Sequence, residues 1–485
     1  MESGAHQTAL RLALPSKSKA MFPRRWLWRE VAVYAVVITL VVVRFFTERF
    51  VILPRFLNAI DLVAIPLLLP FCLRWVMVKQ GGRFKGKTFI ILSGLFCMAW
   101  ALAWLVNYEE VHWLGGGMFI IGLLTPIVFF LILTNLGLDR LFCQRLVRLL
   151  EILLIINLLI GSIDMILALR SGEGGADFIL GTFGVNQNQL SFFLAVMMSY
   201  QLARWRYQGL RLTGLFILVW TSVLFLLCGF QTLWVALAIA AVGVFWFAGK
   251  LSKRLLRVTV LVVLFIAVTM PPLMQSGRFF SVLDKLDELV TNFSELGKVE
   301  LLRNVPQIWQ IHPWSFWIGV GPGTFNSRAF RDIAIVPYQG GVGFTDVAAA
   351  IVEPFYTSEL SSQFIIPYFA RGIFRLSGAN TDAPFTSYVS VPVEAGVPGA
   401  LAFFGIYASA AFALVKAVRK GIVPERRTLA AWALMNLLML LGIAAVDNYL
   451  ETTRYTLLVW LSLAIWRIDM QEGAKFPLHG EGRRV

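Results

Sequence analysis

The stretch GMFIIGLLTPIVFFLILT, residues 117–134, decides the class of fold. It contains no charged side chain, and it is long enough to cross the hydrocarbon core of a bilayer, which takes about 17–25 apolar residues in a helix. A run this continuous does not fit the alternating strands of a membrane barrel, so it predicts a helix. Similar runs occupy residues 31–46, 56–73, 88–106, 149–169, 188–203, 212–228, 230–248, 257–273, 388–415, 429–446 and 453–466.

The composition agrees with this pattern. Of the 485 residues, 58% are hydrophobic and only 15% are charged, and the mean hydropathy is +0.73. A soluble domain of this size needs more polar residues to cover its surface. We therefore predict an all-α polytopic membrane protein of about twelve transmembrane helices, with helices 1–9 in residues 31–273 and helices 10–12 in residues 388–466.

The charges predict the orientation in the membrane. The net charge is +15, which in a soluble protein would suggest nucleic acid, but lysine and arginine also concentrate in the cytoplasmic loops of membrane proteins. Here most of them fall in alternate segments, starting with the tail 1–30 and ending with the tail 467–485. This predicts that both tails are cytoplasmic and that nucleic acid is not a partner. Arg44, Arg49 and Arg55, around the first outer loop, are the exceptions.

Several kinds of chemistry have no motif in the sequence. The cysteines, Cys72, Cys97, Cys143 and Cys228, show no CxxC or Cys/His spacing, so neither a disulfide framework nor a zinc site is expected. No P-loop or dinucleotide-binding motif is present either. We expect a protein that works without a bound metal or cofactor.

One segment differs from the rest of the chain. Residues 274–387 form a long, nearly neutral loop between predicted helices 9 and 10, on the outer face. Loops of this length usually carry function. The apolar spacing from Val282 to Phe293 predicts an amphipathic helix, and the glycines after residue 318 predict tight turns. We expect a partly helical periplasmic loop.

A first motif, GTFGVNQNQL, occupies residues 181–190 at the outer mouth of predicted helix 6. It could simply be a glycine turn followed by an amide helix cap. Alternatively, Gln187 and Asn188 bind sugar hydroxyls or a phosphate at the positive end of the helix dipole.

A second motif runs from Arg303 through HPWSFWIGVGPGTF, residues 312–325. A lone arginine in an outer loop is usually solvated, but this one precedes a helix and a glycine turn that would hold it in place. The planar fork of arginine suits a diphosphate, because it makes two parallel charge-assisted hydrogen bonds. Gly321 and Gly323 are expected to contribute to the same binding site.

A third motif, NTDAPFTSYVSVPVEAGVPG, covers residues 380–399 at the outer edge of predicted helix 10. Glu394 lies about two helical turns after Ser387 and Tyr388, which places a carboxylate within the membrane, a costly position that usually signals function. The alternative is a structural ion pair with a nearby arginine, for which Arg371, Arg375 and Arg454 are the candidates.

The order of the three motifs resembles the bacterial O-antigen ligase and O-antigen polymerase family. The resemblance rests on GTFGVNQNQ, on Arg303 with HPWSFWIGVGPGTF, and on TSYVSVPVEAGVPGALAFF. It covers residues 178–415, and the earlier helices match in topology only. Each motif is weak by itself, whereas their order, spacing and sidedness together are more specific.

The resemblance implies a reaction at the periplasmic face of the bacterial inner membrane. A hydroxyl group of one glycan attacks the anomeric carbon of a glycan carried on undecaprenyl diphosphate, and undecaprenyl diphosphate leaves. The expected partners are the lipid-linked oligosaccharide and membrane lipids, with a chain-length regulator and a flippase as further candidates. Polymerase and ligase differ in the acceptor, which is a second lipid-linked glycan or a lipid core.

The resemblance also suggests roles for residues. It gives the diphosphate to Arg303 and a binding role to Asn188, and Arg371 and Arg375 are candidates for a second phosphate contact. The expected catalytic residues are Arg303, Asp382 and Glu394; the expected substrate-binding residues are Gln187, Asn188, Gly321, Gly323, Arg371, Arg375, Ser387 and Tyr388.

Two positions depart from the family. Ligases carry a histidine just before the Ser-Tyr pair, where this chain has Phe385. Neither Phe385 nor Thr386 can act as a base, so we consider Asp382 as the base in place of the histidine. Gln231 and Thr232 stand where many relatives carry Ser-Arg. Both departures favour a polysaccharide polymerase over a lipid-core ligase.

A transporter for lipid-linked glycans is the competing class. Transporters carry charges near the bilayer midplane, and Asp61, Glu151, Asp164 and Asp447 lie within or at the edges of predicted spans. The chain shows no internal repeat, however, and its large outer loop favours chemistry at the outer face.

Overall fold

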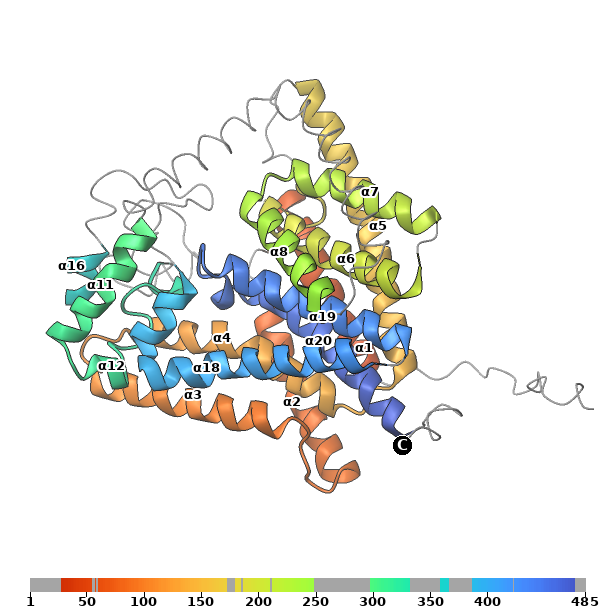
Figure 1. Cartoon of the computed structure of the whole chain (residues 1–485). Helices are drawn as coiled ribbons and strands as arrows, with labels where there is room; N and C mark the ends of the chain where they lie inside the picture. Colours follow the sequence, from red (N-terminus) through yellow and green to blue (C-terminus); the bar gives the residue numbers. More distant parts are fainter. Residues whose placement is uncertain are drawn as a thin grey trace, which may run out of the picture.

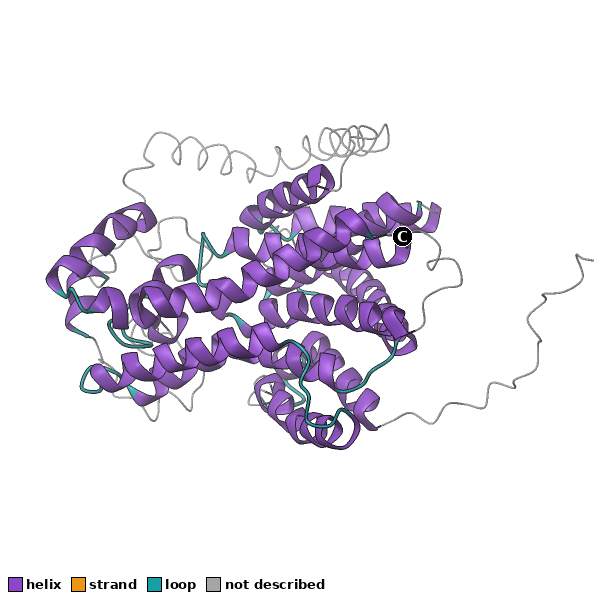
Figure 2. Cartoon of the chain, turned by 60° about the horizontal axis from the view of Figure 1, so that its bottom comes forward, coloured by secondary structure: helices purple, strands orange, loops and turns teal. Residues whose placement is uncertain are grey.

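A computed structural model of the chain describes residues 28–54, 57, 60–171, 179–184, 186–209, 212–247, 297–331, 358–365, 386–421 and 423–475. Within these ranges the chain forms helices and loops and no strand (Figures 1 and 2). The long helices are α1 (Trp28–Arg44), α2 (Ile60–Lys79), α3 (Lys87–Val106), α4 (Trp113–Asn135), α5 (Arg140–Ser171), α6 (Gln187–Gln208), α7 (Leu212–Leu227), α8 (Gln231–Phe247), α18 (Ser387–Lys420), α19 (Pro424–Ile443) and α20 (Thr453–Lys475).

Six of the described helices are long and apolar enough to cross a membrane: α1 with the π-helical turn η1 (Phe45–Arg49) that continues it, α3, α4, α5, α18 and α19. The chain therefore has the build of a helical membrane protein. Every predicted run except 257–273, which lies outside the described residues, overlaps one long helix. A total of twelve spans and the orientation of both tails stay predictions.

Two helices extend furthest beyond the predicted limits. α5 begins at Arg140 rather than at residue 149, and α20 continues to Lys475, into the segment 467–485 that we assigned to the C-terminal tail. Ion pairs explain both extensions. The Asp469 carboxylate lies 3.0 Å from Arg140 and 3.7 Å from Arg426, so it connects the ends of three helices.

The core of the bundle lies where α18, α19 and α20 pack against α3, α4 and α6. Aromatic rings fill the contacts, such as Phe96 against Phe403, with ring centroids 5.1 Å apart. Between α6 and α19, the Ser199 hydroxyl donates to the Asn436 side chain at 2.6 Å. Polar contacts of this kind hold helices together where lipid removes the hydrophobic driving force.

The described helices between α8 and α18 form a smaller unit at one end of the bundle (Figure 1). Its described helices are α11 (Gly297–Ile311), α12 (Ser315–Ile318), α13 (Arg328–Phe330) and α16 (Glu359–Phe364). The buried face of α11, formed by Leu301, Val305 and Ile308, packs in a second hydrophobic cluster with the first turns of α18. The amphipathic stretch 282–293 lies outside the described residues.

Helix α18 breaks where the smaller unit meets the bundle. Gly396 has φ +72° and ψ 164°, so two helical pieces join there at an angle. A Cβ at Gly396 would overlap the carbonyl oxygen of Trp317. Both the positive φ and the close approach require glycine, and the break lets the connection after α12 lie directly against α18.

Candidate functional site

The glycine loop, residues 319–327, connects α12 to α13 and forms the centre of the candidate site. It lies between α18 and the hairpin of α3 and α4: the Val320 N–H donates to the Val393 carbonyl at 2.9 Å, and the Asn107 side chain donates to the Gly319 carbonyl at 3.3 Å. A Cβ at Gly323 would overlap the backbone of Gly115. The glycines therefore allow backbone to pack on backbone.

Glu394 holds the glycine loop in place. Its side chain is fully buried, and its carboxylate accepts backbone N–H bonds from Gly323 at 2.5 Å, Phe325 at 3.2 Å, Asn326 at 2.8 Å and Ser327 at 2.7 Å. A ring of N–H groups around an anion is the arrangement by which loops bind phosphate. Here an internal carboxylate occupies it, so these N–H groups are not available to a substrate.

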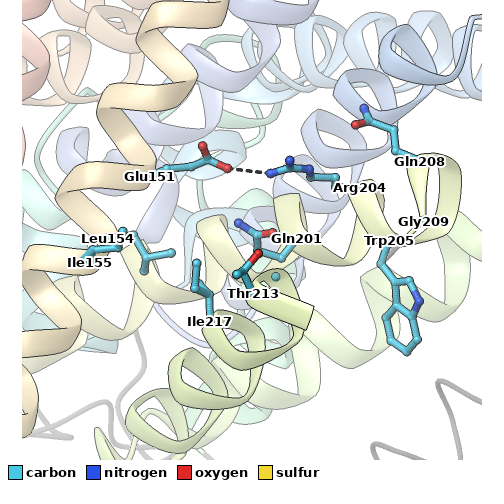
Figure 3. Close-up of a pocket in the computed structure, with 11 residues that line it drawn as sticks. Glu151, Leu154, Ile155, Gln201, Arg204, Trp205, Gln208, Gly209, Thr213 and Ile217 are labelled. Atoms are coloured by element: carbon cyan, nitrogen blue, oxygen red, sulfur yellow. Dashed lines mark hydrogen bonds and ion pairs between the residues drawn. The ribbon is translucent and has the colours of Figure 1, made fainter. Parts of the chain in front are cut away.

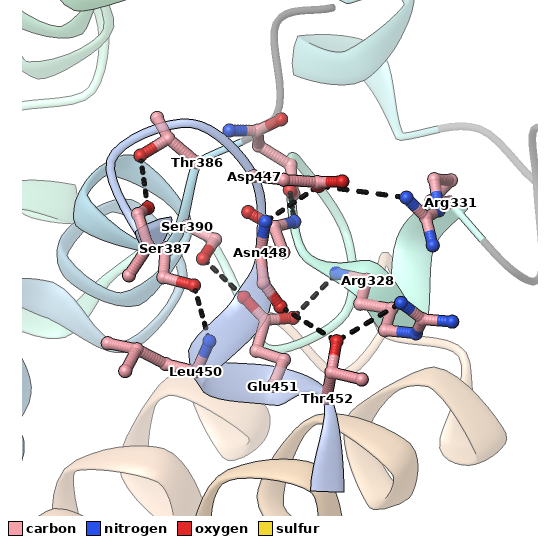
Figure 4. A network of polar contacts seen from close by, with 12 residues as sticks. Arg328, Arg331, Thr386, Ser387, Ser390, Asp447, Asn448, Leu450, Glu451 and Thr452 are labelled. Atoms are coloured by element: carbon pink, nitrogen blue, oxygen red, sulfur yellow. Dashed lines mark hydrogen bonds and ion pairs between the residues drawn. The ribbon is translucent and has the colours of Figure 1, made fainter. Parts of the chain in front are cut away.

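A second buried carboxylate, Glu451, lies on the short 3-10 helix η6 (Tyr449–Glu451) between α19 and α20 (Figure 4). It accepts hydrogen bonds from the Arg328 N–H and the Ser390 hydroxyl, both at 2.5 Å. Burial raises the pKa of Glu451 to about 8, and the charge of Glu394 adds to the increase, against the hydrogen bonds from Ser390 and Arg328.

Two arginines extend from α13 above this carboxylate. The Arg328 guanidinium donates to the Thr452 hydroxyl at 3.1 Å, and the Arg331 guanidinium lies 3.7 Å from the Asp447 carboxylate. Figure 4 shows both arginines on the same side of the connection between α19 and α20. The glycine loop thus positions two cations beside the start of α20.

A third arginine reaches the same region from the first helix. Arg44 lies 3.3 Å from Glu48, and the ring of Tyr455 is within electrostatic range of Arg44, Arg328 and Arg331. We call these three residues the arginine cluster. Two of them have a carboxylate partner among the described residues: Arg44 pairs with Glu48, and Arg331 pairs with Asp447.

The first sequence motif forms a wall beside the arginine cluster. The Asp164 carboxylate in α5 pairs with Arg49, at 2.6 and 3.0 Å, and accepts the N–H of Gly181 at 3.0 Å. A Cβ at Gly184 would overlap the carboxylate of Glu48. The Asn186 side chain then caps α6 by accepting the N–H of Gln189 at 3.0 Å. Asn186 therefore has the helix-capping role that we considered as the structural alternative for this motif.

The structure brings some of the predicted site residues near this region. Gln187 and Asn188 lie in the first turn of α6. Ser387 is fully buried and accepts the Leu450 N–H at 3.3 Å, and the Tyr388 hydroxyl donates to the Leu441 carbonyl at 2.8 Å. Ser387 thus attaches α18 to the connection between α19 and α20, and Tyr388 attaches it to the last turn of α19.

The structure does not show the other predicted residues in the roles expected for them. Arg303 is exposed on α11, away from the buried face of that helix. Gly321 packs close to Val111, where a side chain would collide. Arg371, Arg375 and Asp382 lie outside the described residues. Glu394 contacts backbone N–H groups, which is neither the substrate contact nor the ion pair that we considered for it.

Sequence reasoning missed the arginine cluster and Glu451. Arg44 gave a signal, because it departs from the positive-inside pattern. Arg328 and Arg331 directly follow the glycine loop, which is a signal of the same kind as that used for Arg303. Glu451 gave none, since its burial depends on contacts with residues far away in the chain.

Among the described residues, no group of three or more His, Cys, Asp or Glu side chains is arranged to hold a metal ion. A scan against protein-family models finds no match, and a search of curated proteins finds no significant match. Fold and site together define an all-helical protein with membrane-spanning helices and a polar, arginine-containing site at one end of its bundle.

Proposed function

We propose that the chain is a polysaccharide polymerase of the bacterial inner membrane, and that it extends a glycan carried on undecaprenyl diphosphate. A hydroxyl oxygen of the acceptor glycan forms a bond to the anomeric carbon of the donor glycan. The bond between that carbon and the diphosphate oxygen breaks, and the proton of the hydroxyl ends on the released undecaprenyl diphosphate or on water.

The arginine cluster is the observation that carries the proposal. A leaving diphosphate gains negative charge in the transition state, and fixed cations stabilise that charge where water is excluded. Arg44, Arg328 and Arg331 come from two separate parts of the chain, and the Tyr455 hydroxyl interacts electrostatically with all three. The buried backbone contacts of Glu394 and Glu451 hold the loop that carries two of them.

An amide beside the cluster supports the binding of hydroxyl groups. Asn326 is fully buried, and neither its side-chain nitrogen nor its side-chain oxygen has a hydrogen-bond partner among the described residues. A buried amide without partners is costly, and a sugar hydroxyl, which both donates and accepts, would satisfy it. Gln187 and Asn188 offer further amides from the first turn of α6.

The charges considered for a transporter have structural partners. Glu151 pairs with Arg204, Asp164 with Arg49, and Asp447 with Arg331. Paired in this way, each acid connects two elements of the bundle, and this favours a fixed site over an ion path. The side chain of Asp61 lies outside the described residues. Between polymerase and ligase, Phe385 at the position of the ligase histidine still favours the polymerase.

The test uses purified protein in liposomes, supplied with undecaprenyl-diphosphate-linked repeat units and with neither nucleotide nor metal. We expect a ladder of lengthening glycans on a gel. Arg328→Ala should reduce the initial rate about 100-fold, because two charge-assisted hydrogen bonds to a diphosphate are worth roughly 3 kcal/mol. Arg303→Ala tests the competing diphosphate contact, and Arg419→Ala, exposed at the other end of α18, is the control.

Each outcome has a defined reading. A full rate in Arg328→Ala with a loss in Arg303→Ala would move the donor site to α11. A single transfer onto an added lipid core, without a ladder, would make the protein a ligase. Movement of the lipid-linked glycan across the bilayer without any covalent product would refute the enzyme and favour the transporter.

A further inference from the structure

A polar cavity lies at the far end of α6 from the candidate site. It has a volume of about 250 Å³ and is bounded by α5, the last turns of α6 and the start of α7 (Figure 3). Asn188 and Gln208 are separated by about 30 Å along α6, at 1.5 Å per residue. That length equals the thickness of a bilayer core, so if α6 crosses the membrane, the cavity lies at the level of the lipid headgroups on the opposite face.

Opposite charges line the cavity. Nη1 of Arg204 lies 3.0 Å from Oε1 of Glu151, and the two side chains are 37% and 29% exposed. This contact uses one of the five N–H groups of the guanidinium, and the second carboxylate oxygen of Glu151 has no hydrogen-bond donor among the described residues. The pair therefore offers donors for an anion and an acceptor for a cation within one cavity.

Gln201 adds an unpaired amide to the cavity wall. It lines the cavity and is only 5% exposed, yet no described residue forms a hydrogen bond with its side-chain amide. Figure 3 shows this amide between the ion pair and Thr213. This amide is therefore open to a polar group in the cavity.

The remaining walls fit a lipid. Leu154, Ile155 and Ile217 add apolar surface, and Ile155 is 40% exposed. Trp205 lies at the rim, and tryptophan is enriched at the level of the headgroups. A ligand here meets polar groups inside and apolar groups toward the membrane, as a phospholipid requires.

We propose that this cavity binds the headgroup of an aminophospholipid, with the phosphate on Arg204 and the primary ammonium between Glu151 and Gln201. A primary ammonium has three N–H donors, which match the carboxylate, the Gln201 carbonyl and the Thr213 hydroxyl. Choline has no N–H to donate, and the glycerol headgroup of phosphatidylglycerol brings no cation to Glu151.

The experiment is native mass spectrometry of the purified full-length protein in detergent. Phosphatidylethanolamine, phosphatidylcholine and phosphatidylglycerol with identical acyl chains are added in equal amounts, and free phosphoethanolamine is tested separately. We expect about tenfold more retained phosphatidylethanolamine than either other lipid, since one charge-assisted hydrogen bond is worth roughly 1.4 kcal/mol. Glu151→Gln should abolish this preference.

Glu425→Gln is the matched control. It removes the same charge from an exposed residue at the same end of the bundle, where Gln208 of α6 bonds to Thr428 of α19 at 3.1 Å. If Glu151→Gln does not fold, Gln201→Leu replaces it. Equal retention of the three lipids by the unaltered protein would overturn the proposal, as would a preference that survives in both cavity variants. Equally tight binding of free phosphoethanolamine would overturn the assignment to a lipid.

Discussion

Replacing Glu394 by glutamine should release the glycine loop from α18. The carboxylate accepts four backbone N–H groups, three of them on Oε1 and that of Gly323 on Oε2. A glutamine amide keeps one oxygen and presents an NH₂ group at the other position. The Gly323 N–H would then face a donor, while the other three bonds would lose their charged acceptor.

The magnitude follows from these four bonds. A buried N–H without an acceptor costs about 1–3 kcal/mol, and replacing a charged acceptor by a neutral one costs roughly 1 kcal/mol for each remaining bond. The sum, about 4–6 kcal/mol, is a large part of the 5–15 kcal/mol that typically separates a folded domain from its unfolded state. We therefore expect the loop to open while the bundle stays folded.

Hydrogen exchange followed by mass spectrometry measures this directly. Peptides that cover residues 319–330 should exchange at least about 100-fold faster in Glu394→Gln, which corresponds to an opening free energy lowered by roughly 3 kcal/mol. Glu359→Gln, an exposed change in the first turn of α16, is the control and should exchange as the unaltered protein does. Equal exchange of these peptides in all three proteins would refute the anchoring role of Glu394.

Three further predictions concern stability in detergent. Because the pKa of Glu451 is raised to about 8 from its ordinary 4.5, its contribution to stability is fully present below about pH 4.5 and is lost as the pH rises through 8. Glu451→Gln should therefore flatten the fall of Tm between about pH 5 and pH 9, and an unchanged slope would contradict this. Gly396→Ala should lower the free energy of unfolding by at least about 1–2 kcal/mol because Gly396 has a positive φ. Gly94→Ala, in an open helical position, is the control and should raise the free energy of unfolding by up to about 1 kcal/mol. Equal effects of the two substitutions would refute the requirement for glycine at position 396. Asp164→Asn should lower the free energy of unfolding by about 3–5 kcal/mol, because it breaks the buried pair with Arg49. A smaller decrease when Arg49→Gln is already present would confirm the pairing. Additive decreases would exclude it.

The sequence predicted the helices well because each apolar run ends where polar residues or glycine begin. The start of α18 at Ser387 and the start of α20 at Thr453 each lie within one residue of the predicted position. The start of α5 and the end of α20 were not predicted, because the contacts that stabilise them are not visible in the local sequence pattern. Asp469 meets Arg140 and Arg426 only after three helices have come together.

The candidate site was harder to predict because its main contacts use backbone atoms. Glu394 stood out as a carboxylate within an apolar run, but its partners are N–H groups, which every residue other than proline has. No side chain in the glycine loop marks them. Likewise, Arg303 and Arg328 are equally plausible diphosphate ligands by sequence, and only the packing of α11 and α13 distinguishes an exposed arginine from one beside a buried polar network.

The contact between Gly319 and Gly396 has a consequence for sequence variation. A side chain at Gly319 would collide with the backbone of Glu394 and Gly396, and a side chain at Gly396 would collide with the backbone of Trp317 and Ile318. Neither collision can be relieved by a smaller neighbouring side chain, because backbone is present in every residue. Among homologues we expect both positions to be glycine. Where one of them changes, we expect the other to change as well, because the loop and the break in α18 are then both lost.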